Sequence, residues 1–313
     1  MDVTVRPLTE SDLPAAARII PLAFGTFLGV SELDHFWSDI DYAGTRWRAE
    51  HTRSFGCEMG GEIVGSNFVT RWGSVGFFGP LTVRPDLWDQ GIGKRLIEPA
   101  MDCFDRWKTR PAGLYTFAQS SKHVGLYQKF GFWPRFLTAI MSKPFRNGPS
   151  PVDGSLYSKL PQAARGECLD QCRELTDRLY EGLDLTGEIR AVETQRLGET
   201  LLLWDDGKLV GLAVCHCGVG TEAGKGQCYV KFGAVRSGLT AGELFGRLLD
   251  DCEALAAARG MSRLKAGVNL ARHEAYRKML EQGFRTETQG VTMHRPNEPG
   301  YSRPEVFLID DWR

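Results

Sequence analysis

Two glycines and a lysine stand where a helix is expected to begin, just after an apolar strand. Leu81–Val83 reads as the end of that strand, Pro85 stops it, and a helix is expected to start around Gly91–Gly93. Small residues let the backbone approach a ligand, and the first amide N–H groups of a helix have no partner within it. Their partial positive charge suits a phosphate, and Lys94 adds a full charge. The segment therefore predicts a phosphate-binding turn, although glycines kept only for packing would give the same pattern.

The cysteines, a second group with chemical potential, do not have the spacing of a metal site. Cys168 and Cys172 are spaced for one face of a helix, and Cys215-His216-Cys217 lies in a strand-like run. Neither group is a C-x-x-C pair at zinc spacing. We therefore expect no metal and interpret the cysteines as reduced thiols of a cytoplasmic protein.

The elements that must position these residues form a mixed α/β pattern. They do not alternate as a run of βαβ units would. In the first half, strands are expected at Val3–Pro7, Cys57–Met59, Glu62–Trp72, Val75–Val83, Leu114–Ala118 and Arg135–Ser142. Helices are expected at Glu10–Leu22, from about Gln90 to Trp107, and at Ser121–Phe130.

Together with a later motif, the glycine turn resembles the GNAT acyltransferase superfamily. The order of strand, Val83-Arg84-Pro85, glycine turn and helix is followed by Tyr127-Gln-Lys-Phe-Gly131-Phe132, and the resemblance covers most of residues 1–143. In that family the turn has the form Arg/Gln-x-x-Gly-x-Gly/Ala and binds the pyrophosphate of coenzyme A. The strand before it pairs with the pantetheine arm. The resemblance implies an N-acetyltransferase that moves an acetyl group from acetyl-CoA to an amine acceptor, a small molecule, by direct attack in a ternary complex.

The resemblance also implies roles for individual residues. Tyr127 would protonate the departing thiolate, which is chemically sensible because a phenol has a pKa of about 10 and a thiol of about 8.5. The alternative is a tyrosine that packs its ring at a helix end. A backbone N–H near Val83 would hold the oxyanion. The acetyl-CoA site would comprise Leu81, Thr82, Val83, Asp89, Gln90, Gly91, Ile92, Gly93, Lys94 and Ser120.

Three positions depart from the family pattern. Trp88 stands where the glycine motif usually begins with Arg or Gln, and Ser120 stands where Asn is often found. The strand segment Phe77-Phe78-Gly79-Pro80 lacks the glutamate base that many members have there. The first two departures leave the backbone cradle intact, whereas the third leaves the base unassigned. The candidates that remain are a chain of water molecules and the side chains of His123, His35 and Asp34.

The chain contains its own pattern twice. Gly61-Glu-Ile-Val-Gly65 has a counterpart in Gly207-Lys-Leu-Val-Gly211. Val83-Arg84, Arg95-Leu96 and Gly131-Phe132 then recur 152 residues later, at Val235-Arg236, Arg247-Leu248 and Gly283-Phe284. A boundary is expected within Pro144–Gly154, where prolines and glycines end regular structure. We therefore expect two tandem GNAT-like domains, residues 1–145 and 155–313, packed as a pseudo-dimer with a mixed sheet.

The second copy has lost the residues on which the coenzyme site depends. The counterparts of Gly91, Gly93 and Tyr127 are Glu243, Phe245 and Met279. A glutamate at the mouth of a pyrophosphate site repels its ligand by about 3 kcal/mol, at about 6 Å and an effective dielectric near 20. A phenylalanine would fill the space where the backbone must approach the ligand. We therefore expect a degenerate second domain that binds no coenzyme A.

The amine is expected to enter over the segment between Phe24 and Trp47. Its aromatic rings and carboxylates suit a cationic or amphipathic amine, although rings that belong to the core would fit the sequence equally well. The residues concerned are Phe24, Phe27, Phe36, Trp37, Tyr42 and Trp47, with Asp34, Asp39 and Asp41.

The segment Tyr301–Arg313 closes with an apolar run, two acids and a tryptophan. Exposing such a run costs about 1.5–3 kcal/mol for each large side chain, so we expect it to be docked. One hypothesis places it across the domain interface, with Asp310, Asp311 or the terminal carboxylate near the thioester. The other is that it merely completes the sheet of the second domain.

Composition limits the classes of function. A net charge of −1 gives no electrostatic reason to expect nucleic acid or an anionic membrane as partner. No apolar run approaches the roughly 18–20 residues of a membrane span, and the start lacks a signal-peptide pattern. We expect a cytoplasmic monomer or homodimer that uses a coenzyme A thioester and an amine. The alternatives are an acyl-CoA-binding regulatory protein without turnover and a protein-modifying acetyltransferase whose second domain docks a macromolecule.

Overall fold

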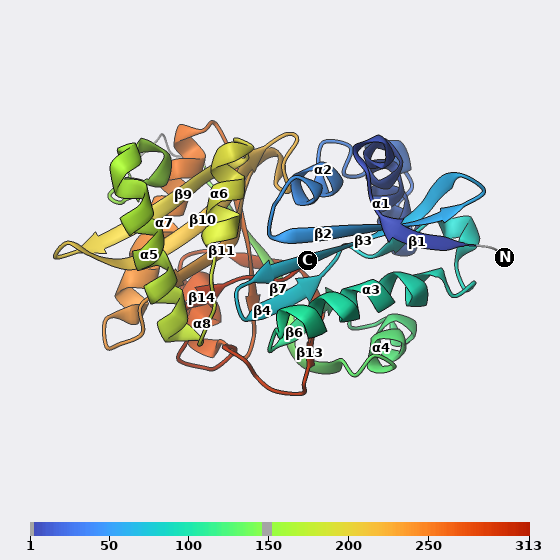
Figure 1. Cartoon of the computed structure of the whole chain (residues 1–313). Coiled ribbons are helices and arrows are strands. Elements are labelled where there is room, and N and C mark those ends of the chain that lie inside the picture. The colour runs from blue at the N-terminus through green and yellow to red at the C-terminus, as the bar shows by residue number, and fades with distance from the viewer. Residues whose placement is uncertain (1–2, 146–151) are drawn as a thin grey trace.

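Fourteen strands form one continuous sheet in the computed structural model, which describes residues 3–145 and 152–313 (Figure 1). The strands of the first half are β1 (Thr4–Pro7), β2 (Thr52–Met59), β3 (Glu62–Trp72), β4 (Val75–Phe78), β5 (Thr82–Val83), β6 (Ala112–Thr116) and β7 (Trp133–Pro144). The strands of the second half are β8 (Ser155–Leu156), β9 (Gly198–Asp205), β10 (Lys208–Gly218), β11 (Gly224–Val235), β12 (Arg263–Asn269), β13 (Arg285–Arg295) and β14 (Leu308–Ile309).

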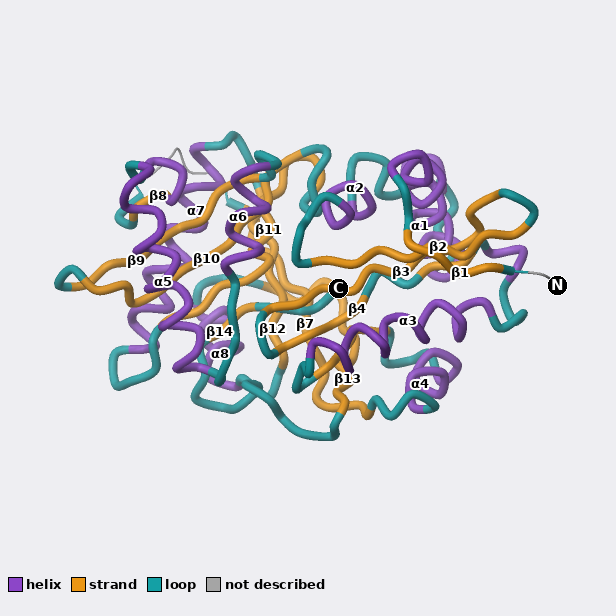
Figure 2. The backbone as a smooth tube through the Cα atoms, in the orientation of Figure 1, coloured by secondary structure: helices purple, strands orange, loops and turns teal. Residues whose placement is uncertain are grey.

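Helices cover both faces of this sheet, so the expected mixed α/β fold is confirmed (Figure 2). They are α1 (Leu13–Leu28), α2 (Tyr42–Trp47), α3 (Ile92–Trp107), α4 (Ser121–Gln128), α5 (Gln162–Leu179), α6 (Thr186–Thr194), α7 (Ala241–Ala258) and α8 (His273–Glu281). None of the helices among the described residues is long and apolar enough to cross a membrane.

Several elements differ from the sequence-based prediction, among them β2, which begins at Thr52 instead of Cys57, and α2, which was not predicted. The expected strand from Val75 to Val83 is interrupted at Gly79-Pro80 and becomes β4 and β5, because Gly79 takes a φ of +148° that strands do not use. Helix α1 continues to Leu28 instead of ending at Leu22, since its buried face continues past Pro21. It stops at Gly29, whose left-handed φ of +68° caps the helix.

The two halves pair their strands in the same register. Phe77 lies opposite Gly113 in the parallel pair of β4 and β6, and the counterparts Tyr229 and Lys265 lie opposite each other in β11 and β12. At the centre of the sheet, Thr138 of β7 pairs with Gly290 of β13, its own counterpart 152 residues later. A residue that pairs with its own counterpart marks a two-fold axis, so the halves form the expected pseudo-dimer.

The last strand of each half lies among the strands of the other half. The central order is β4-β6-β13-β7-β12-β11, so β13 separates β6 from β7, and β7 separates β13 from β12. The sequence repeats meet near residues 145–155, but the sheet is not divided there. Each half of the sheet is therefore completed by the other half of the chain.

The first half buries separate clusters on the two faces of its strands. On one face α3 packs Ile97 and Phe104 against Val69 and Phe78. On the other face α1 and α2 pack against Phe68. These two layers fix the positions of β5, β6 and the start of α3, which together form the candidate site.

Candidate active site

A gap opens in the sheet between β5 and β6. Beyond the pairing of Phe77 with Gly113, β6 bonds only to β13 among the described strands, and β5 bonds only to β3. The facing edges of Leu81–Val83 and of Leu114–Thr116 therefore have no strand partner. An extended ligand with its own amide groups can pair with such an edge as an added strand does.

The N-terminus of α3 lies at the end of β5, beside this gap. Gly91 caps the helix with a φ of +80°, which favours glycine, and a Cβ on Gly93 would make an ordinary contact of 3.7 Å with Leu126. The unusual Trp88 has a structural role here, since its indole N–H donates to the Val83 carbonyl at 2.8 Å. Trp88 therefore holds the end of β5 against the turn that leads to Gly91.

The remaining residues of the predicted coenzyme site line the gap and the turn. Thr82 is buried and Leu81 and Val83 are half-buried, whereas Asp89, Gln90 and Lys94 are exposed around the start of α3 and Ile92 packs beneath it. Asp89 forms an ion pair with Lys122 of α4 at 2.5 Å. Ser120 caps α4 by accepting a hydrogen bond from the His123 N–H at 3.3 Å, so its oxygen has a structural role in this structure.

Tyr127 lies on the α3 side of the gap, in an apolar environment. Its ring centroid is 5.7 Å from that of Phe78, and its side chain belongs to the buried cluster around Phe132. Burial raises the pKa of the phenol above its usual range, and the nearby Thr116 hydroxyl lowers it in part. The phenol therefore remains protonated at neutral pH and can donate a hydrogen bond.

Four of the predicted acceptor aromatics form a wall at the end of β6. Phe27 of α1 lies 4.9 Å from both Phe117 and His123, measured between ring centroids. Phe24 lies 5.1 Å from Trp37, which stacks on Phe36 at 4.7 Å. Burial lowers the pKa of His123, with a contribution from Lys122, so its imidazole is neutral at neutral pH.

Four of the other predicted acceptor residues have structural roles. Tyr42 is buried in the core, and the Trp47 indole donates to the Leu8 carbonyl at 3.0 Å. Asp41 caps α2 by accepting from the Gly44 N–H at 2.6 Å, and Asp39 accepts from the Lys225 N–H at 2.5 Å, which docks the loop on the second half. Asp34 and His35 are exposed. Four of the six predicted aromatics therefore lie together in the wall, Tyr42 and Trp47 belong to the core, and the role of the wall in binding the acceptor stays a prediction.

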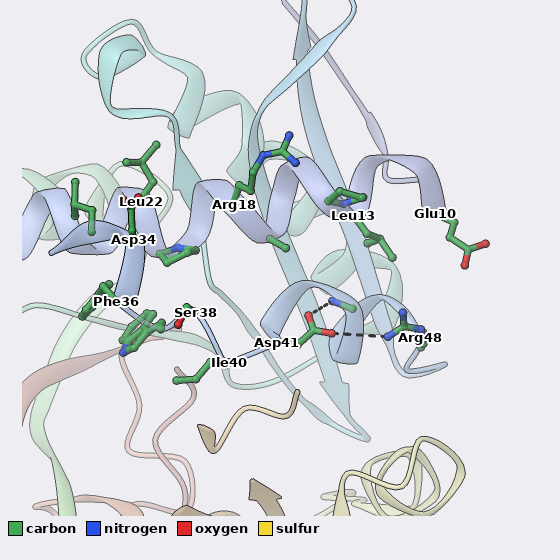
Figure 3. A pocket seen from close by; sticks show the side chains of 16 residues that line it. Glu10, Leu13, Arg18, Leu22, Asp34, Phe36, Ser38, Ile40, Asp41 and Arg48 are labelled. Atoms are coloured by element: carbon green, nitrogen blue, oxygen red, sulfur yellow. Dashed lines mark hydrogen bonds and ion pairs between the residues drawn. The ribbon is translucent and has the colours of Figure 1, made fainter. Parts of the chain in front are cut away.

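An open groove of about 750 Å³ lies between α1 and the segment Leu33–Arg48 (Figure 3). Arg18 and Leu22 of α1 form one side, and Phe36 and Asp41 lie on the other. None of the groove's lining residues belongs to β4, β5, β6 or α3. The groove is therefore separate from the gap, and we place the chemistry at the gap because the free strand edges and the helix N-terminus converge there.

A buried network of charges at the junction of the halves was not foreseen from the sequence. Arg46 of α2 binds both carboxylate oxygens of Glu222 at 2.9 Å and donates to the Gly79 carbonyl, at the edge of the gap. The Lys231 ammonium forms ion pairs with Glu222 at 2.9 Å and with Glu188 at 3.0 Å. Burial alone would raise the pKa of Glu222, but Arg46 and Lys231 outweigh it and hold the pKa well below its usual range. A lysine inside the apolar strand Cys228–Val235 was the available sequence signal.

The corresponding gap of the second half is filled by the chain itself. Strand β14 enters between β11 and β12, where Leu308 pairs with Ala234 and the Phe307 carbonyl accepts from the Val235 N–H at 3.3 Å. Ala234 and Val235 are the counterparts of Thr82 and Val83 in the open gap. The tail therefore completes the sheet of the second half, as one of the two hypotheses predicted.

The residues after β14 continue into the first half. Asp310 is bound by Arg272 at 2.5 Å and by the Tyr301 hydroxyl, so it serves the second half. The Trp312 ring lies parallel to the Phe77 ring at 5.9 Å and covers Gly113, where any Cβ would overlap it. The main-chain oxygen of Arg313 accepts from Arg46. The tail thus also lies against the first half, while the hypothesis that Asp311 or the terminal carboxylate lies near the thioester stays a prediction.

All eight cysteines are free thiols, and no group of three or more His, Cys, Asp or Glu residues within 3–145 and 152–313 is arranged to hold a metal ion. Cys168 and Cys172 are buried on α5, and Cys215 is buried on β10.

Comparison with known proteins identifies this arrangement. Residues 18–132 match the sequence pattern of the Acetyltransferase (GNAT) family. No curated protein matches the chain. A putative acetyltransferase from Pyrococcus horikoshii is 15% identical with a TM-score of 0.70, and the match covers 99% of this chain and 95% of that one.

Two further solved structures match nearly the whole chain. A GCN5-related N-acetyltransferase from Sphaerobacter thermophilus is 18% identical with a TM-score of 0.58, over 93% of this chain and 95% of the other. A tandem GNAT protein from the clavulanic acid biosynthesis pathway is 14% identical with a TM-score of 0.55, over 94% and 98%. These likenesses show the fold, and the sequence pattern shows the family. Residues 18–132 are thus a GNAT acetyltransferase domain, and the chain as a whole has the tandem GNAT fold.

Proposed function

We propose that the chain transfers an acetyl group from acetyl-CoA to the amine of a small molecule at the gap between β5 and β6. The observation that carries this proposal is the pair of free strand edges that lead to the N-terminus of α3. The edge of Leu81–Val83 suits the amides of a pantetheine arm, and the helix N-terminus with Gly91 and Lys94 suits a pyrophosphate. The corresponding gap in the second half is filled by β14, so one coenzyme binds per chain.

The reaction forms a bond between the amine nitrogen and the acyl carbon and breaks the bond from that carbon to sulfur. A main-chain N–H of Leu81–Val83 stabilises the charge on the carbonyl oxygen. Tyr127 donates a hydrogen bond to the sulfur as it leaves. Because burial raises the pKa of Tyr127, complete proton transfer to a thiolate is uphill, and stabilisation through the hydrogen bond is its main contribution.

The amine proton leaves through a base that the strand itself does not supply, since Phe77-Phe78-Gly79-Pro80 contains no acid. Of the three side chains named from the sequence, His123 alone stands in the aromatic wall at the end of β6, with a lowered pKa that keeps it able to accept a proton. Water that passes the proton to His123 completes the balance of the reaction.

The small size of the acceptor follows from what covers the gap. The second half and its tail close the face opposite α3, where Trp312 is 5% exposed and Arg46 is 2% exposed. A protein surface has no approach through this layer, whereas a small amine fits beneath it. This arrangement favours small-molecule acetylation over the modification of a protein.

Incubation with labelled acetyl-CoA and a panel of small amines tests the proposal, with release of the free thiol as the readout. We expect amine-dependent thiol release and a labelled amide. Tight binding of acetyl-CoA without thiol release for any amine would show an acyl-CoA-binding protein instead.

A further inference from the structure

A buried carboxylate with an unused oxygen lies where the tail crosses the first half. The Asp311 side chain is 0% exposed. Its Oδ1 accepts from the Tyr229 hydroxyl at 2.9 Å and from the Arg313 N–H at 3.2 Å. Its Oδ2 has no hydrogen-bond partner, because Arg313 Nε is 3.2 Å away but is not aligned for one. A buried carboxylate oxygen without a donor carries a large desolvation cost, so this site is suited to a further donor.

The guanidinium of Arg313 lies over this carboxylate and an aromatic ring. Its Cζ is 4.3 Å from the centroid of Tyr229, which is the geometry of a cation–π contact. The charge of Arg313 also lowers the pKa values of Tyr42 and Tyr115, which burial raises, so both phenols lie near it. The guanidinium thus contacts Tyr229 and Asp311, with the phenols of Tyr42 and Tyr115 within range of its charge, and we call these surroundings the chamber.

Glycines in the central strands leave the space that the side chains of the chamber occupy. A Cβ on Gly267 of β12 would overlap the carboxylate of Asp311, and a Cβ on Gly290 of β13 would overlap the ring of Tyr115. Tyr115 follows Gly113 by two residues on β6, where the gap begins. The chamber therefore borders the gap on the face opposite Tyr127 and α3.

The charges of the junction distinguish Asp311 from its neighbours. Glu222 is compensated by Arg46 and Lys231, and Glu188 by Lys231 and His51, all on helices, strands or their ends. Within the described part of the chain, the ion pair of Asp311 is with Arg313 of the tail. When the guanidinium leaves, Asp311 loses its charge partner, and burial, which raises its pKa, favours the neutral acid until another cation binds. Such a site selects a cation.

We propose that this chamber is the cation-binding subsite for the acceptor, in which Arg313 takes the place of a guanidinium or ammonium group of the amine substrate. This inference rests on the proposed function at the gap. The acceptor then carries two groups, a cationic head that binds Asp311 and Tyr229 and a separate amine that reaches the acetyl group. Short diamines and guanidino-amines such as 4-guanidinobutylamine have this chemistry.

Chemical rescue of Arg313→Ala tests the chamber without any turnover. Methylguanidinium at ten times its Kd is expected to raise the Tm of this variant by about 2–4 °C, whereas the neutral methylurea leaves it unchanged. Adding Asp311→Asn to the same variant is expected to remove the effect. The matched control is Arg277→Ala on α8, an exposed arginine in ion pairs with Glu274 and Glu281, which should show no rescue. Equal responses to methylguanidinium in Arg313→Ala and Arg277→Ala would overturn the proposal.

Substrate preference tests whether the chamber serves the acceptor. We expect kcat/KM for 4-guanidinobutylamine to exceed that for pentylamine at least tenfold, and Asp311→Asn to remove most of this preference by raising KM. Methylguanidinium should compete with 4-guanidinobutylamine when binding to Arg313→Ala is measured by calorimetry. Rescue without competition would show a cation site that is not the acceptor subsite, and the proposal would then be wrong. Competition without any acetylated product would contradict the proposed function instead and leave the subsite standing.

Discussion

The two gaps of the sheet lie at equivalent positions of the strand register, but one is open and the other is filled by a strand. Between β5 and β6 the strand edges are free, whereas β14 lies between β11 and β12 and bonds to the counterparts of Thr82 and Val83. At the helix that follows, Gly91 and Gly93 leave the N-terminus open, whereas Phe245 fills it and packs on Phe307 at 5.4 Å. In the second half, a segment of the chain therefore lies where the first half has free strand edges.

This exchange gives the second half a new role. Phe307 and β14 anchor the tail in the closed gap, and the next residues lie over the open one, where Trp312 stacks on Phe77. The segment that fills the closed gap thus continues directly into residues that cover the open gap of the other half. We infer that a degenerate copy persists because the active copy is incomplete without it.

Separating the halves should have the largest effect. In a fragment of residues 1–150, β6 loses β13 on one edge and β7 loses β13 and β12 on both edges, so three strand edges lose their partners. We expect this fragment to be poorly soluble or inactive when expressed alone, as judged by size-exclusion chromatography and circular dichroism. Co-expression with residues 151–313 should restore a soluble complex. A soluble fragment with full activity would show that the two gaps are independent.

Making the open gap resemble the closed one should abolish coenzyme binding. Gly91→Glu places a carboxylate at the helix N-terminus and forces a side chain onto a φ of +80°. Repulsion of about 3 kcal/mol alone weakens binding by about a hundredfold. Calorimetric titration of the unaltered chain should give one coenzyme A per chain, and Gly91→Glu should give none.

Gly166→Glu is the matched control, because this exposed glycine of α5 has open space around it. It should leave coenzyme affinity unchanged. A stoichiometry near two in the unaltered chain would contradict the closed state of the second gap. Coenzyme A binding by Gly91→Glu would show that the phosphate site was assigned to the wrong residues.

Tyr127→Phe tests the chemistry of the open gap. Its counterpart in the closed half is Met279, which cannot donate a proton. We expect the substitution to lower turnover by about ten- to a thousand-fold and to keep acetyl-CoA affinity within a few-fold. Tyr276→Phe on α8, the helix that corresponds to α4, is the control and should change neither. Unchanged turnover in Tyr127→Phe would assign this tyrosine to packing alone.

The sequence predicts the elements and the duplication well because these depend on local patterns. The strand Glu62–Trp72 has the predicted bounds, and the constant offset of 152 residues reappears as identical strand registers. The exchange of β7 and β13 leaves no such trace, since two copies of one pattern do not say which copy pairs with which. The expectation of two tandem domains packed as a pseudo-dimer therefore did not include this exchange of strands.

Long-range contacts explain the remaining differences at the site. The carboxylates of Asp39 and Asp41 were expected to face the acceptor, but they bind backbone N–H groups, one of them in the second half. The pairing of Arg46 with Glu222 joins residues 176 positions apart. No rule of sequence spacing connects such residues, so their burial and pairing could be found only in the structure.

The smallest expected effect is a difference between β13 and β7 in how each contributes to the pH dependence of the unfolding free energy. His294 of β13 is 1% exposed, and its counterpart in β7 is Ser142, which does not titrate in this range. Burial lowers the pKa of His294 to about 4, with a smaller opposing effect of its bond to the Glu298 carbonyl. The Nδ1 atom lies 2.7 Å from that carbonyl oxygen, and the ring lies 5.1 Å from that of Trp312. The strand that supports the tail thus depends on a neutral histidine.

In the unfolded chain His294 becomes protonated below a pH of about 6.5, whereas in the folded chain it becomes protonated only below about 4. The stability from this residue is therefore complete above pH 6.5 and is lost as the pH falls towards 4. Between pH 7.5 and 5 the loss is about 2 kcal/mol of unfolding free energy. His294→Asn keeps an N–H for the Glu298 carbonyl but does not titrate. Urea unfolding at the two pH values should show a pH dependence about 2 kcal/mol smaller in this variant, with Ser142→Asn unchanged in its pH dependence. Equal losses in the unaltered chain and in His294→Asn would show that the support of the tail does not depend on this protonation.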